Sequence, residues 1–185
     1  MTAWSNGLGL LVARACDIER TEGEIMTNKA RAVLTDCEHA LELLRQPTDP
    51  YTFRVLWVGG VALARAVGHV LDKVDAAQDE RTRVAVDSAW TSWKADKADN
   101  AIFWEFIQDE RNQVLKQYEL CFFEGDAYFK TGDEVIPLGY CQFHQITSGV
   151  FSGQDCRDVL ERAIDWWEHQ LAAIEAAARS QSDHV

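Results

Sequence analysis

Residues 49–71 read DPYTFRVLWVGGVALARAVGHVL, and this stretch decides the fold. Asp49 followed by Pro50 is typical of a helix N-cap and first helical position, so the sequence predicts a helix that begins here and continues to about residue 76. Because apolar residues lie on nearly every side, we expect the central, most enclosed helix of a bundle. Basic side chains and a glycine pair interrupt the apolar run, which argues against a membrane span.

Apolar residues recur at three- and four-residue steps in further segments on both sides of this helix. They predict additional helices at about 28–46, 79–97, 100–120 and 152–180. We expect Asp99 or Asn100 to cap the fourth helix, and Ser152 with Asp155 to form a capping box at the fifth. Short β-compatible runs broken by glycine and proline predict an insertion with a small hairpin at about 121–150.

The fold class that follows is all-α: an antiparallel helical bundle of about five helices, with a small β-hairpin insertion before the last helix. The chain has 185 residues, of which 47% are hydrophobic, enough for one sizeable core. We therefore expect a leader of uncertain structure at 1–27 and one domain at 28–180. The glycines of the second helix would let a neighbouring helix approach closely.

The charge balance restricts the function classes. Thirty acidic and 18 basic residues give a net charge of -12, which repels phosphate backbones and anionic membranes, although a local basic cleft remains open. The five cysteines show no metal or disulfide spacing, so we expect no metal and no disulfide framework. No Walker loop or dinucleotide fingerprint is present, and we expect no cofactor. There is no signal-peptide layout, and the expected location is the cytoplasm, without a membrane partner.

Two helices carry polar residues where the pattern predicts core. At 100° per residue, Glu110 falls inside the apolar stripe of the fourth helix, with Arg111 on its flank and Asn112 on the polar side. On the second helix Arg65, His69 and Asp72 follow one line. Buried charges need partners or a wet cleft, so two interpretations stay open: an ion-pair network that fixes helix register, or a functional cleft. For the remaining histidines, we expect surface or supporting roles; these are His39, His144 and His169.

Residues 110–118, ERNQVLKQY, resemble the motif of the HEPN superfamily of small helical domains. In that family an Arg-polar pair is followed at helical spacing by His, and its members include metal-independent ribonucleases of toxin and antiviral systems. Arg111 and Asn112 match the first half of the motif. Lys116 stands at the usual His position, and Tyr118 stands at the longer spacing.

The resemblance implies that Arg111 binds phosphate and stabilises developing charge, that Asn112 orients the site and that Glu110 positions Arg111. Lys116, Tyr118 or His69 would complete the site by moving a proton. Lys and Tyr side chains titrate near 10, far from neutral pH, whereas His titrates near it. Arg65 would add a second binding cation.

The resemblance further implies an RNA-directed or nucleotide-binding module of a prokaryotic stress or defence system, such as a toxin–antitoxin pair. It would be a ribonuclease or an inactive relative. The helices carry more aromatic surface than one small bundle can bury, so we also expect a symmetric homodimer, with paired Arg111 clefts in this hypothesis. The alternative is a noncatalytic helical bundle that binds a partner protein. The two interpretations differ in whether Glu110 and Arg111 are sealed by mutual bonds or open to a cleft shared with Arg65 and His69.

Overall fold

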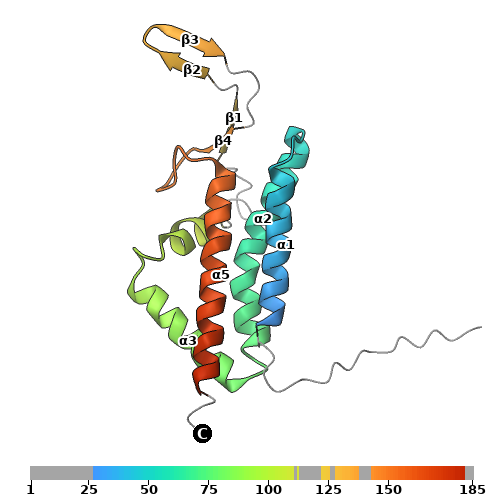
Figure 1. Cartoon of the computed structure of the whole chain (residues 1–185), viewed down its shortest axis with the longest axis vertical. Helices are drawn as coiled ribbons and strands as arrows, with labels where there is room; N and C mark the ends of the chain where they lie inside the picture. Colours follow the sequence, from blue (N-terminus) through green and yellow to red (C-terminus); the bar gives the residue numbers. More distant parts are fainter. Residues whose placement is uncertain (1–26, 111, 113–121, 126–127, 138–142, 182–185) are drawn as a thin grey trace, which may run out of the picture.

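The helices of the structure lie close to the predicted ranges. The computed structural model describes residues 27–110, 112, 122–125, 128–137 and 143–181, so the predicted leader lies outside the described residues except for Thr27. The helical elements are α1 (Asn28–Leu44), α2 (Pro50–Val70), the π-helical turn η1 (Leu71–Asp75), α3 (Glu80–Ala95), the π-helical η2 (Ile102–Gln108) and α5 (Cys156–Ser180). In Figure 1, α1, α2 and α5 run alongside one another and α3 crosses beside α5. The all-α prediction is confirmed.

The insertion before α5 contains two short antiparallel strand pairs. β1 (Phe122–Gly125) pairs with β4 (Phe143–Ile146), and between them β2 (Tyr128–Thr131) pairs with β3 (Glu134–Pro137). Gly132, with φ of 60°, provides the left-handed backbone that the tight β2–β3 turn needs. Figure 1 shows both pairs projecting from the end of the bundle. The predicted hairpin insertion is confirmed.

The helix starts follow the predicted capping in part. Asp49 caps α2 by accepting hydrogen bonds from the backbone N–H groups of Tyr51 (3.0 Å) and Thr52 (3.1 Å), as predicted. The capping box predicted with Ser152 is wrong, because Asp155 is itself the N-cap of α5. The predicted Asp99 or Asn100 cap is also wrong, since η2 follows Ala101 without a side-chain cap.

The core lies between the inner face of α2 and α5. Trp57 of α2 and Trp167 of α5 are fully buried, and Trp167 Nε1 donates a hydrogen bond of 2.7 Å to the Ala64 carbonyl. Two glycines of α2 permit this contact: a Cβ on Gly60 would lie 3.0 Å from Leu160, and one on Gly68 would lie 2.7 Å from the Trp167 ring. The close approach predicted at the glycines therefore occurs at Gly60, and it recurs at Gly68.

The opposite side of α2 is open, so the expectation that α2 is the most enclosed helix is wrong. Tyr51 is 73% exposed and Val55 is 72% exposed. We call this side the outer face of α2; its exposed or half-buried residues are Tyr51, Val55, Gly59, Ala62, Ala66 and Val70. Together α2 and η1 are long and apolar enough to span a membrane by length and composition alone, and only 33% of their most apolar window is buried.

Ion pairs at seven-residue steps fix α1 against α5, and we call this contact the α1–α5 seam. Arg31 pairs with Glu175 (2.6 Å) and Glu168 (3.1 Å), and Arg45 pairs with Glu161 (2.7 Å). Antiparallel helices that repeat charges every seven residues keep them on the shared edge. At the middle step Glu38 breaks this pattern: burial raises its pKa, and the nearby carboxylates of Glu168 and Glu42 raise it further.

Changing Glu38 to Gln is expected to stabilise the fold by a few tenths of a kcal/mol at pH 7, because one like-charge contact disappears. A raised folded-state pKa means that the wild type loses stability as pH rises above the ordinary value of 4.5. The gain should therefore vanish below that pH. Urea unfolding at pH 7 and pH 4 measures it, with Asp36→Gln on the exposed side of α1 as control. Equal gains in both variants would contradict a specific repulsion at the seam.

Candidate functional site

A cavity of about 180 Å³ lies between α2, α3, η2 and α5, and we call it the Arg65 cavity. One edge is formed by Arg65, His69 and Asp72, the three α2–η1 residues that the sequence placed on one line. Aromatic rings form the wall, and they are Trp90, Trp93, Phe103 and Trp167. The polar line predicted on α2 and η1 therefore lies at a cavity. Across the cavity it faces tryptophan rings and not Glu110.

Arg65 is half-buried at this cavity. Its guanidinium carbon lies 6.0 Å from the centre of the Phe103 ring, within the range of a cation–π contact. Gly68 lies beside it, because a Cβ there would be in ordinary van der Waals contact with Arg65 Nη1 at 3.5 Å. The arginine is therefore supported by its surroundings, with a planar group of donors at the cavity.

The aromatic wall is held in place by its own contacts. Trp93 packs at 5.7 Å from Phe103 and edge-on at 5.8 Å from Trp167, between ring centres. Its indole N–H donates to Gln170 (2.7 Å), and its carbonyl accepts the indole N–H of Trp104 (3.1 Å). Rings locked in this way form a preorganised surface for a planar ligand. The sequence did not predict that these rings meet at Arg65.

Two carboxylates line the cavity, and cations lie next to its lining residues. Asp72 lies 2.8 Å from Lys73, and Asp87 lies 3.2 Å from Arg83, so a neighbouring cation offsets each carboxylate. The hydrogen bond to Asp72 raises the pKa of Lys73. Lys94 adds a cation 5.4 Å above the partly exposed Trp90 ring. The mouth therefore offers hydrogen-bond acceptors without a strongly negative field.

Glu110 is buried, as predicted, with 6% of its surface exposed. It lies near Cys156 at the start of α5, where burial raises the pKa of the Cys156 thiol and the charges of Asp155 and Glu110 add to that rise. It does not belong to the lining of the Arg65 cavity. Asn112 is half-buried. The other residues of the HEPN-like motif lie outside the described residues; they are Arg111, Lys116 and Tyr118.

His144, expected in a surface or supporting role, is 1% exposed, so the surface assignment is wrong. Its ring stacks on Phe53 with centres 3.5 Å apart, and its backbone N–H donates to Asp155 (3.3 Å). Burial raises the pKa of Asp155, but hydrogen bonds from Arg157 outweigh it and hold the pKa below its ordinary value. The two-residue period of a strand could have found His144, because it shares a face with buried Ile146.

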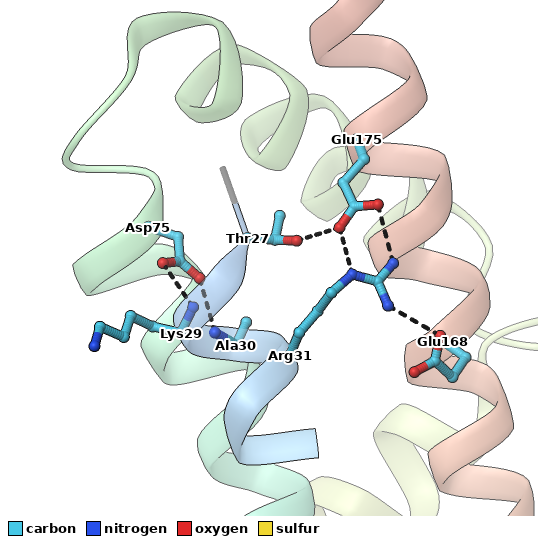
Figure 2. Close-up of polar contacts among 7 residues, drawn as sticks. All are labelled: Thr27, Lys29, Ala30, Arg31, Asp75, Glu168 and Glu175. Carbon is cyan, nitrogen blue, oxygen red and sulfur yellow. Dashed lines mark hydrogen bonds and ion pairs between the residues drawn. The ribbon is translucent and has the colours of Figure 1, made fainter. Parts of the chain in front are cut away.

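A cluster of polar contacts joins α1, η1 and α5, and the sequence did not predict it (Figure 2). Asp75 is 2% exposed and accepts the backbone N–H groups of Ala30 (2.8 Å) and Lys29 (3.3 Å). Burial raises the pKa of Asp75, and those two N–H bonds oppose the rise. Thr27 donates its hydroxyl to Glu175, which also accepts from Arg31. Every contact drawn is internal, so we assign this group to holding the first turn of α1.

Within the described part of the chain, no group of three or more His, Cys, Asp or Glu residues is placed to hold a metal ion. The chain matches no protein-family model, no curated protein and no solved structure.

Proposed function

We propose that this protein is a cytoplasmic nucleotide-binding module, which takes a free nucleotide or a nucleotide of single-stranded RNA into the Arg65 cavity. The observation that carries the proposal is the joint placement of Arg65 and His69 against an aromatic wall. This assignment agrees with the HEPN resemblance and with a role in prokaryotic stress or defence, while it moves the binding site to α2 and α3.

The chemistry of the cavity matches the parts of a nucleotide. The aromatic wall suits the planar base, since stacking contributes about 1–3 kcal/mol per base. Arg65 and His69 supply donors for phosphate oxygens, and Arg is the side chain best shaped for them. Asp72 and Asp87 supply acceptors for ribose hydroxyls or base amino groups. A volume of about 180 Å³ suits one ring rather than a whole large ligand.

The proposed module binds its ligand without cutting it. Glu110, the described carboxylate of the HEPN-like motif, is buried outside the cavity lining. A group that assists cleavage must reach the reacting phosphate within hydrogen-bond distance or through one water. Of the described motif residues, neither Glu110 nor Asn112 lines the cavity. We therefore propose an inactive relative of the ribonucleases that the motif resembles, in which His69 binds phosphate and does not move a proton.

Binding is tested by titrating the protein with the four ribonucleoside monophosphates and with short single-stranded RNA, following tryptophan fluorescence. Trp90 and Trp93 line the cavity, so an occupied site should change their emission. Replacing Arg65 with Gln is expected to weaken binding about tenfold or more, because a charged hydrogen bond contributes about 1.5–3 kcal/mol.

The matched control is Arg54→Gln, on the same helix but stacked on Tyr51 (5.2 Å) instead of in the cavity. It should bind like the wild type, and circular dichroism should show both variants folded. Equal affinities for the two variants, or no nucleotide binding by the wild type, would reject the proposal. Binding of RNA without binding of monophosphates would identify the polymer as the ligand source.

Cleavage is tested separately by incubating single-stranded and structured RNA with the wild type in EDTA. The expected result is intact RNA. Metal-independent cleavage that disappears in a folded Arg111→Ala variant would replace the binding-only proposal with a ribonuclease.

A second candidate function is the noncatalytic protein-interaction bundle. It is favoured by one observation, the apolar outer face of α2, where Tyr51 and Val55 are more than two-thirds exposed. Capture of a different protein through this face, with no nucleotide bound at the cavity, would support that candidate.

A further inference from the structure

One acidic side chain of the Arg65 cavity lies beside its most exposed ring. Asp87 and Trp90 both line the cavity, and they are three residues apart on α3. Trp90 is 36% exposed, whereas each of the other three rings of the wall is at most 6% exposed. Side chains at this spacing are neighbours on one helix face, with Cβ atoms about 5–6 Å apart. A planar base that stacks on Trp90 therefore has the Asp87 carboxylate within reach of its edge.

The Asp87 carboxylate is oriented by a neighbour and still has acceptor capacity. Its Oδ2 accepts a hydrogen bond of 3.2 Å from Arg83, one turn earlier on α3. An ionised carboxylate has two oxygens with about four acceptor positions and no donor. The contact with Arg83 takes up one of these positions. Asp87 is therefore suited to a ligand edge that presents two donors side by side.

The four bases differ in the donors that they offer to a carboxylate. Guanine presents its N1–H and its 2-amino group side by side, so two parallel hydrogen bonds can form to the two carboxylate oxygens. Adenine and cytosine present one amino group beside a ring nitrogen that is an acceptor, and uracil presents one N–H between two carbonyls. An acceptor that faces a carboxylate repels it. Guanine is therefore the base whose edge fits Asp87.

Resting on the nucleotide-binding function above, we propose that the Arg65 cavity prefers guanine nucleotides and that Asp87 selects the base. Arg65 and His69, on the α2 side of the cavity, hold the phosphate. The donor edge of guanine belongs to its six-membered ring, and a volume of about 180 Å³ suits the entry of that ring. Asp72, the other carboxylate of the lining, follows His69 by three residues and so lies on the phosphate side.

The test is the affinity of the whole chain for GMP, IMP, AMP, CMP and UMP, measured by isothermal titration calorimetry. GMP is expected to bind about tenfold or more tightly than AMP, CMP and UMP, the discrimination that a bidentate contact with a base provides. IMP keeps the N1–H but lacks the 2-amino group, so its affinity should fall between those of GMP and AMP. In Asp87→Asn, GMP should bind no more tightly than AMP, because an amide offers one acceptor and one donor.

The matched control is Asp72→Asn, which removes the same charge at the other carboxylate of the cavity. It should keep the preference for GMP over AMP. The ratio of the two affinities cancels the general effect of charge on anions, because both ligands carry the same phosphate. Both side chains are more than half exposed, so circular dichroism should show both variants folded. A preference that is lost in Asp72→Asn instead would overturn the assignment to Asp87.

Failure of this inference differs from failure of the proposed function. Equal affinities for all the monophosphates, or a GMP preference that survives Asp87→Asn, would overturn the inference while the cavity still binds nucleotides. If the chain binds RNA but no monophosphate, the same ratio is measured with oligouridine that carries one central guanosine or adenosine, and equal affinities again overturn it. Absence of binding to every monophosphate and RNA would reject the proposed function, and the inference with it.

Discussion

Replacing Glu175 with Ala is expected to lower the free energy of unfolding by about 2–3 kcal/mol at pH 7. The Glu175 side chain is only 6% exposed and accepts two hydrogen bonds from Arg31, of 2.6 and 2.9 Å, besides that of the buried Thr27 hydroxyl. Its loss leaves these donors without their acceptor. The effect falls below that of a fully buried pair because Arg31 is 31% exposed and retains Glu168.

The matched control is Glu161→Ala in the same seam, where both partners are more than 40% exposed, and a loss below about 1 kcal/mol is expected. Urea unfolding measures both variants. Equal losses would show that burial does not distinguish the two ion pairs, contrary to the structure.

The Glu175 effect should depend on pH with a definite sign. Burial raises the Glu175 pKa, but the hydrogen bonds from Arg31 and Thr27 outweigh burial and hold the pKa below its ordinary value of 4.5. A lowered folded-state pKa contributes stability that is present above pH 4.5 and is lost as pH falls through the folded value. The difference between wild type and Glu175→Ala should therefore shrink below about pH 4.5. A constant difference from pH 7 to pH 3 would contradict the assignment.

Replacing Gly68 with Ala is expected to lower the free energy of unfolding by up to about 2 kcal/mol, whereas Gly59→Ala should raise it by about 0.5–1 kcal/mol. Both gain helix propensity, since alanine exceeds glycine by about 1 kcal/mol in a helix. At Gly68 the new methyl would lie 2.7 Å from the fully buried Trp167 ring, and overpacking costs about 1–3 kcal/mol. At Gly59 the space is open.

The two glycine variants are compared with the wild type by urea unfolding under the same conditions. Opposite signs are the expected result. A gain at Gly68 equal to that at Gly59 would mean that Trp167 moves freely, contrary to its hydrogen bond with Ala64.

The sequence predicted where the helices begin and end better than it predicted what packs against them. Local signals were sufficient where the cause is local: Asp49 and Pro50 start α2 where predicted, and the heptad pattern of α5 extends to Ser180 as expected. The error in α2 had a specific cause. Apolar residues on every side of a helix predict burial, but composition does not say whether a neighbour from the same chain covers each side.

The sequence predicted part of the candidate site, again because the cause is local. Spacing along α2 placed Arg65, His69 and Asp72 on one line, since helix geometry is local. Which wall they face depends on how α3 and η2 pack, and no periodicity carries that information. Asp75 shows most clearly what the sequence does not predict. Nothing in the residues around it indicates that its carboxylate accepts a hydrogen bond from the start of another helix, 45 residues earlier.

That contact has a consequence for how the chain folds during synthesis. α1 leaves the ribosome before the other described helices, but its first turn is held by Asp75 and Glu175, which follow their partners by 45 and 148 residues. Most of the stability of such a helix comes from tertiary packing of its apolar face and not from its 17 residues alone. Until α5 emerges, nascent α1 lacks its contacts with Glu175. The part of its apolar face that α5 covers is then accessible to chaperones and proteases. The earliest helix is thus among the last parts to be secured.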